Sequence, residues 1–98
     1  MTAKQLSQFV EIRRLLKEAY DDYFRRSEDG HCKSAEASIE VYYPNYWEAE
    51  EYAPNEACGI GIYSYVLGPS RTHDFPTFEL ALEAVKDWHR MQMSWEPE

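Results

Sequence analysis

Apolar residues recur every three or four positions over the first part of the chain, which is the spacing of one face of an α-helix. Thr2 and Gln5 have the spacing of a capping box, in which each side chain bonds a free backbone N–H at the start of a helix. Gly30 is a natural stop, because glycine adopts the left-handed conformation that ends helices. The pattern therefore predicts one long helix that ends before Gly30. Its apolar stripe consists of Leu6, Phe9, Ile12, Leu16, Ala19 and Tyr23.

The period then changes from 3.6 to 2, which indicates strands. Residues 35–43 alternate between apolar and polar side chains, and residues 57–67 do so again. Gly59 and Gly61 lie inside the second of these strands, where glycine indicates a bulge or the close approach of another backbone. The Gly-Pro-Ser turn at 68–70 allows residues 71–75 to return as a third, antiparallel strand.

The last periodic segment predicts a second helix that begins at Pro76-Thr77, with Thr77 as its N-terminal cap. Its apolar stripe consists of Phe78, Ala81, Leu82, Val85, Trp88 and Met91. The element order is α-β-β-β-α, and each helix has one apolar stripe. We expect an α+β fold with one domain over residues 1–98, in which two helices pack on one face of a three-stranded antiparallel sheet. A chain of 98 residues is long enough for one modest core.

The formal net charge is −8, and it is unevenly distributed. Residues 34–70 contain six acidic side chains and neither lysine nor arginine. An acidic chain is a poor direct binder of nucleic acid, because phosphate contacts need an excess of basic side chains. No apolar run approaches the length of a membrane span, and the first residues lack the apolar core of a secretion signal. We therefore expect a cytoplasmic protein that binds neither nucleic acid nor membrane.

The acidic middle segment is also rich in tyrosine, with six of the eight tyrosines of the chain. Residues 44–56 form a long connection between two predicted strands, and such connections are often functional. Aromatic side chains are enriched in protein interfaces, and a field of one sign is self-repelling unless a basic partner uses it. A solvated sheet face and loop is the simpler interpretation. The candidate protein-binding residues are Glu36, Glu40, Tyr42, Tyr46, Trp47, Glu48, Glu50, Glu51, Tyr52, Glu56, Tyr63 and Tyr65.

Cysteine and histidine side chains offer an alternative chemistry. Cys58 and His73 fall on strands predicted to be neighbours, and nucleophilic catalysis needs a thiolate beside a base. The simpler interpretation is that Cys58 fills the core and that His73 is exposed on an edge strand. His31 and Cys32 could join them around a metal ion, but the chain has no Cys-x-x-Cys or His-x-x-x-His spacing. We therefore expect no enzyme activity, no metal and no cofactor.

The leading hypothesis is a non-enzymatic inhibitor or binding protein that presents a negative, tyrosine-rich surface to a basic protein partner, such as a nucleic-acid-binding groove. In size, charge and element order the chain resembles phage-encoded inhibitors of host defence, including anti-CRISPR proteins, although no motif carries this resemblance. One alternative is a small regulatory or structural subunit that forms homodimers or larger complexes through its helices. A second alternative is a small enzyme built on Cys58 and His73.

Overall fold

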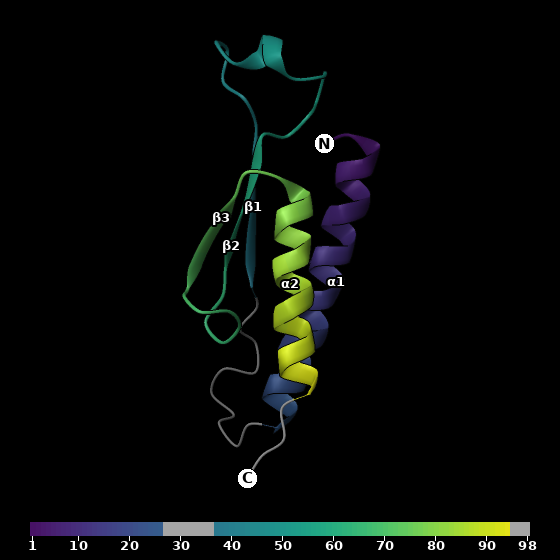
Figure 1. Cartoon of the computed structure of the whole chain (residues 1–98), viewed down its shortest axis with the longest axis vertical. Coiled ribbons are helices and arrows are strands. Elements are labelled where there is room, and N and C mark those ends of the chain that lie inside the picture. Colours follow the sequence, from purple (N-terminus) through teal and green to yellow (C-terminus); the bar gives the residue numbers. More distant parts are fainter. Residues whose placement is uncertain (27–36, 95–98) are drawn as a thin grey trace.

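The structure is a computed structural model that describes residues 1–26 and 37–94. These residues form two α-helices, three β-strands and one short 3-10 helix in the expected order (Figure 1). The elements are α1 (Ala3–Arg26), β1 (Ser38–Tyr42), η2 (Ala49–Glu51), β2 (Gly59–Tyr63), β3 (Thr72–Phe75) and α2 (Phe78–Met93). Both predicted helix starts are confirmed. Thr2 and Gln5 form the reciprocal capping box, and the Thr77 hydroxyl accepts a hydrogen bond from Leu80 N–H at 3.1 Å.

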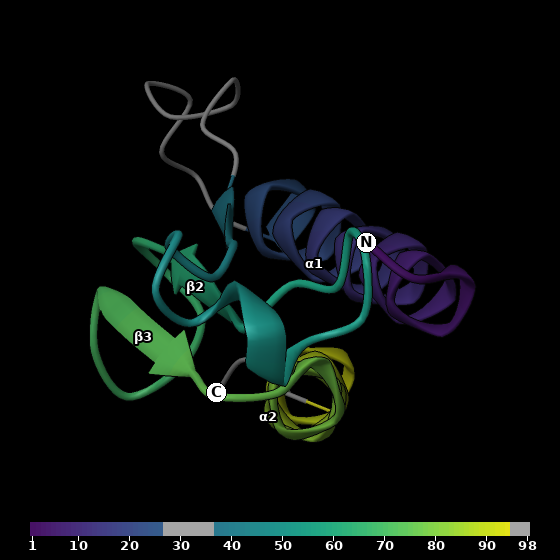
Figure 2. The same cartoon turned by 90° about the horizontal axis from the view of Figure 1, so that it is seen from above.

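The three strands form an antiparallel sheet in the order β1-β2-β3. Ile39 lies opposite Ile62, and Ile62 lies opposite His73, so these residues share one face. Ile60 and Ile62 are fully buried on this face. Figure 2 shows α1 and α2 together on one side of the sheet, which leaves the other face without a covering layer in the described part of the chain.

The two helices lie side by side and run in the same direction (Figure 1). Each contact between the two helices joins residues that are separated by nearly the same number of positions in the sequence. His89 Nε2 lies 3.2 Å from Glu18 Oε1, and Gln92 Nε2 donates to Asp22 Oδ2 at 3.1 Å. The helices are parallel because the chain reverses its direction at each of the four connections from α1 through the three strands to α2. An even number of reversals leaves α2 pointing the same way as α1. The molecule is elongated, at 52 × 22 × 20 Å.

The core fills the space between the helices and the inner face of the sheet. It is built mainly from the predicted helix stripes and the inward side chains of β2. Its buried apolar residues are Ile12, Leu15, Leu16, Ala19, Tyr20, Ala57, Ile60, Ile62, Leu67, Phe78, Ala81, Val85 and Trp88. Two residues of the predicted apolar stripes are not part of this core: Leu6 is 50% exposed and Met91 is 67% exposed.

A buried polar cluster ends β2 earlier than the sequence predicts. The hydroxyls of Tyr20 and Ser64 lie 2.8 Å apart and are hydrogen-bonded. Tyr65 N–H donates to the Tyr20 hydroxyl at 3.0 Å, and Leu67 N–H donates to the Ser64 hydroxyl at 3.0 Å. These side chains replace the sheet partners that a longer strand would have used.

The predicted strand over residues 57–67 is therefore correct only for its centre. The chain leaves the sheet at Ser64, and a loop closed by the hydrogen bond from Ser64 N–H to Arg71 C=O at 2.8 Å connects β2 to β3. Strict strand alternation would place Leu67 on the outer face with Tyr63 and Tyr65, but the loop turns it into the core. Within this loop Gly68 has φ +83°, a left-handed conformation that favours glycine.

We predict that Ser64→Ala destabilises the fold by about 1–3 kcal/mol, because it leaves the buried Leu67 N–H without an acceptor. Urea unfolding measures this change. The matched control is Ser70→Ala, whose exposed hydroxyl donates to Thr72 C=O at the start of β3. It should cost less than about 0.5 kcal/mol. Equal losses in both variants would contradict the role assigned to the cluster.

A second buried polar group, Asp22, ties the C-terminal half of α1 to α2. Its carboxylate accepts hydrogen bonds from Arg25 and from Gln92, and Arg26 Nε lies 2.9 Å from it. These donors, with Arg25 first, lower the pKa of Asp22 from 3.8 to about 2. The ionised carboxylate is therefore favoured by folding.

We predict that Asp22 contributes stability that is complete above about pH 4 and is lost as the pH falls toward 2, because protonation removes the charge that these donors stabilise. Asp22→Asn should flatten the stability profile over this range. The profile is measured by urea unfolding at stepped pH, with Asp21→Asn as the exposed control. A wild-type slope retained in Asp22→Asn would show that other carboxylates cause it.

Candidate protein-binding surface

The connection between β1 and β2 extends past the end of the sheet (Figure 1). Asn45 starts its turn, because its side-chain oxygen accepts hydrogen bonds from Trp47 N–H at 2.9 Å and Glu48 N–H at 3.0 Å. The short helix η2 follows directly. Tyr46 and Trp47 are 85% and 86% exposed, and their rings meet edge to face with centroids 5.4 Å apart. Two large aromatic rings are thus held together in solvent at the loop tip.

Three carboxylates flank this aromatic pair. Glu48, Glu50 and Glu51 are all exposed and lie within or next to η2. In the described part of the chain, none of the three forms an ion pair. We call Tyr46, Trp47, Glu48, Glu50 and Glu51 the loop tip.

The base of the loop is fixed to the start of α1. The Gln5 side chain donates to Ala57 C=O and accepts from Ala57 N–H, each at 2.9 Å. The N-terminal ammonium of Met1 donates to the Tyr43 hydroxyl at 3.2 Å. The two ends of the loop therefore contact Gln5 of α1 and Met1 just before the helix, which orients the tip relative to the rest of the molecule.

The remaining predicted residues of the loop have structural contacts. Glu56 accepts a hydrogen bond from Ala53 N–H at 2.8 Å and so closes the turn that contains Asn55, whose φ is 66°. Tyr52 is half-buried, and burial raises the pKa of its hydroxyl, with smaller effects from Cys58 and nearby glutamates. Both residues support the loop from below its tip.

On the outer face of the sheet, Tyr42 lies across the two glycines of β2. A Cβ added at Gly61 would lie 2.4 Å from the Tyr42 hydroxyl, so glycine is needed for this close approach. The Tyr42 hydroxyl donates to Asp74 Oδ1 at 2.8 Å, and this bond raises the pKa of Tyr42, with added repulsion from Asp74 and Glu40. Of the two alternatives predicted for these glycines, the bulge is wrong, because β2 pairs with both neighbours without interruption. The close approach of another backbone is confirmed at Gly59, where an added Cβ would lie 3.1 Å from Phe75 C=O.

Tyr63 and Tyr65 lie at the opposite end of the sheet from the loop tip. Their rings meet edge to face with centroids 5.2 Å apart. The Arg71 guanidinium lies over the Tyr65 ring, 5.3 Å from its centroid, as a cation–π contact. This end therefore carries a basic group and is not part of a purely negative surface.

The twelve predicted residues thus do not form one patch. They divide into the loop tip with its base, the centre of the outer sheet face with Glu40 and Tyr42, and the far end with Tyr63 and Tyr65. Glu36 lies outside the described residues. Sequence reasoning missed Asn45, Asp74 and Arg71. Alternation within residues 72–75 could have placed Asp74 beside Tyr42, whereas the position of Arg71 depends on the unpredicted loop.

The proposed Cys58–His73 pair is not assembled. His73 lies opposite Ile62, four residues along β2 from Cys58, which is roughly 13 Å. His73 is also not the exposed residue that was expected. It is half-buried on the inner face, with its ring 4.7 Å from that of Trp88 and its Nε2 2.8 Å from Ser70 C=O.

His31 and Cys32, the other residues considered for a metal site, lie outside the described residues. Among residues 1–26 and 37–94, no three histidine, cysteine, aspartate or glutamate side chains are grouped closely enough to hold a metal ion. Neither described helix is long and apolar enough to cross a membrane.

We predict that Gln5→Ala loosens the loop, because the Ala57 amide loses its acceptor and the N-terminal cap of α1 loses one member. Hydrogen exchange at Ala57 should accelerate by about tenfold, the equivalent of one ordinary hydrogen bond. Gln8→Ala serves as the control on the same helix. Unchanged exchange at Ala57 in Gln5→Ala would show that the loop is held by its other contacts.

The chain was compared with protein-family models, curated proteins and solved structures, and none of them matches it.

Proposed function

We propose that this protein is a non-enzymatic binding protein whose loop tip docks on a basic surface of a partner protein. The observation that carries the proposal is the joint exposure of Tyr46 and Trp47, at 85% and 86%, beside three exposed carboxylates that form no ion pair among the described residues. A hydrophobic pair of this size in solvent is a cost to the free protein. Burial of the two rings in a partner removes this apolar surface from water and so contributes favourably to the free energy of binding.

The negative charge of the loop tip favours a partner with a basic surface. Glu48, Glu50 and Glu51 are close together in the sequence, and the described part of the acidic segment supplies no basic side chain to neutralise them. Carboxylates in this arrangement attract a groove lined with lysine and arginine and accelerate the encounter with it. Aromatic rings beside acidic groups also share the chemistry of bases beside phosphates. A nucleic-acid-binding groove is therefore the partner class that fits, and inhibition of an anti-defence kind, as by anti-CRISPR proteins, is one form that this binding would take.

The loop is suited to this role because its fixed base reduces the entropy lost on binding. The Asn45 side chain accepts the hydrogen bonds that form the turn, and the Gln5–Ala57 pair holds the end of the loop that leads into β2. A preorganised loop binds more tightly than a mobile loop with the same side chains. Glu40, Tyr42, Tyr63 and Tyr65 lie away from the tip and would act as a secondary surface.

We predict that neutralising the tip with Glu48→Gln, Glu50→Gln and Glu51→Gln abolishes partner retention. The measurement is affinity capture from a cell lysate at about 0.1 M and about 1 M salt, between which screening grows strongly. Basic proteins should be retained by the wild type at low salt, released at high salt, and displaced by added DNA or RNA. Each retained protein is then purified, and its affinity for the loop variant should fall by at least about tenfold.

The matched control neutralises three exposed acids on α2: Glu79→Gln, Glu83→Gln and Asp87→Asn. It changes the net charge by the same three units and leaves the loop intact. A control that loses the partner as strongly as the loop variant would show that bulk charge, and not the loop tip, governs binding. Trp47→Ala provides a test without a charge change and should also weaken binding.

A further inference from the structure

A strip along the outer side of α1 has the opposite chemistry to the loop tip. Leu6 and Val10 are 50% and 58% exposed, and Arg13 and Lys17 are exposed one and two turns further on. The spacing of four, three and four residues places these side chains in one line about 16 Å long. We call Leu6, Val10, Arg13 and Lys17 the α1 strip.

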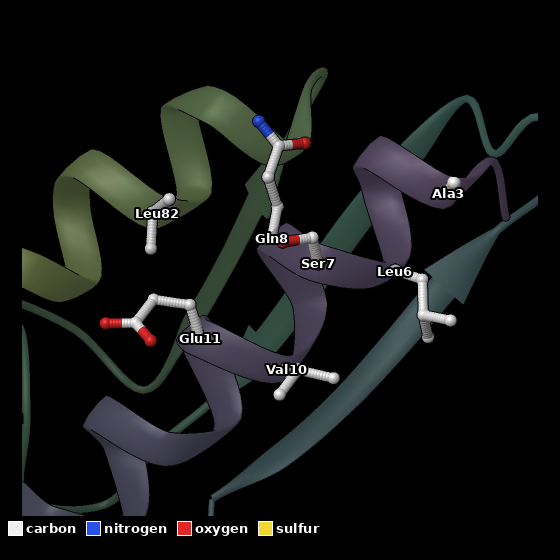
Figure 3. A pocket seen from close by; sticks show the side chains of 7 residues that line it. All are labelled: Ala3, Leu6, Ser7, Gln8, Val10, Glu11 and Leu82. Atoms are coloured by element: carbon white, nitrogen blue, oxygen red, sulfur yellow. The ribbon is translucent and has the colours of Figure 1, made fainter.

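The basic residues of the α1 strip are available for an external partner. In the described part of the chain, Arg13 and Lys17 form no ion pair, whereas the neighbouring Arg14 is held by Glu11 and Glu18 at 2.6 Å. Leu6 and Val10 also line a hollow of about 590 Å³ that reaches Leu82 of α2. Figure 3 shows that the side chains of Leu6 and Val10 extend from the side of α1 that faces away from Leu82. The strip thus combines apolar surface with two exposed positive charges.

We propose that the loop tip of one copy docks on the α1 strip of a second copy, giving a two-fold symmetric dimer. The tip offers two aromatic rings and three carboxylates. The strip offers two aliphatic side chains, a hollow and two exposed cations without an ion pair among the described residues. If the loop of one copy lies on the strip of its partner, two-fold symmetry places the partner's loop on the first copy's strip. Each copy would then cover both unpartnered surfaces of the other.

The position of the loop allows this arrangement. The loop extends beyond the N-terminal end of α1, so it is free to reach a second molecule without obstruction by its own helix (Figure 1). If α1 of the second copy runs antiparallel to α1 of the first, its α1 strip lies beside the loop tip of the first copy. The inference does not rest on the proposed function, because self-association is measurable without any other protein. It does imply that a dimer and a partner compete for the loop tip.

Sedimentation velocity over a range of protein concentrations tests the dimer. The wild type should dimerise at about 0.1 M salt and shift toward monomer at about 1 M, where charges are screened within about 3 Å. Two charge-reversed variants should each weaken dimerisation by at least about tenfold, since like charges then face each other. One variant reverses the loop (Glu48→Lys, Glu50→Lys, Glu51→Lys), and the other reverses the strip (Arg13→Glu, Lys17→Glu).

An equimolar mixture of the two variants gives the decisive measurement. In a mixed dimer, the lysine loop meets the glutamate strip, and the unaltered loop of the second variant meets the unaltered strip of the first. Both contacts are complementary, so the mixture should dimerise although neither variant does so alone. Recovery in the mixture also shows that both variants are folded.

The control variant Lys4→Glu, Lys86→Glu reverses two exposed bases away from the strip and should dimerise like the wild type. A wild type that stays monomeric at low salt overturns the proposal, as does a mixture that stays monomeric. Dimers that persist in both reversed variants would place the interface elsewhere. The strip variant keeps its loop intact, so it should still capture a basic partner; loss of dimerisation with retained capture separates this inference from the proposed function.

Discussion

The odd number of strands between the two helices is the constraint on which the rest of the structure depends. Three antiparallel strands reverse the chain so that α1 and α2 run in the same direction on one face of the sheet. Parallel helices place their negative C-terminal ends together, which is unfavourable. Basic side chains at these ends offset the repulsion, with Arg25 and Arg26 in the last turn of α1 and Arg90 in the last turn of α2. The Asp22–Gln92 and Glu18–His89 contacts then fix the register of the helices.

The loop tip is separate from this core in both position and chemistry. Its turn is made by hydrogen bonds that the Asn45 side chain accepts from nearby backbone N–H groups, and its base is held by Gln5. Among the described residues, the three carboxylates of the tip form no ion pair with the rest of the fold. Side chains that the fold does not need are free to serve recognition. The same separation applies to Arg13 and Lys17, which point away from the core of α1 and are not neutralised within the described chain.

Several elements were predictable because their causes are local. The capping box of Thr2 and Gln5 and the cap at Thr77 depend only on residues three positions apart, and both are confirmed. The ends of β2 were not predictable, because Ser64 leaves the sheet to bond Tyr20, which is 44 residues away. His73 was misplaced because four residues of an edge strand do not reveal which of their two faces is covered; the answer depends on Trp88 of α2.

The sequence by itself determined the element order, the helix starts and the concentration of acidic and aromatic residues between positions 34 and 70, because these depend on local periodicity and composition. Only the tertiary structure decided which of those residues lie together. Antiparallel pairing sends successive strand ends to opposite ends of the sheet, so Tyr63 and Tyr65 lie far from Trp47 despite their proximity in sequence. It also places Asp74 against Tyr42, because the register of β2 with both neighbours sets which side chains meet across the glycines.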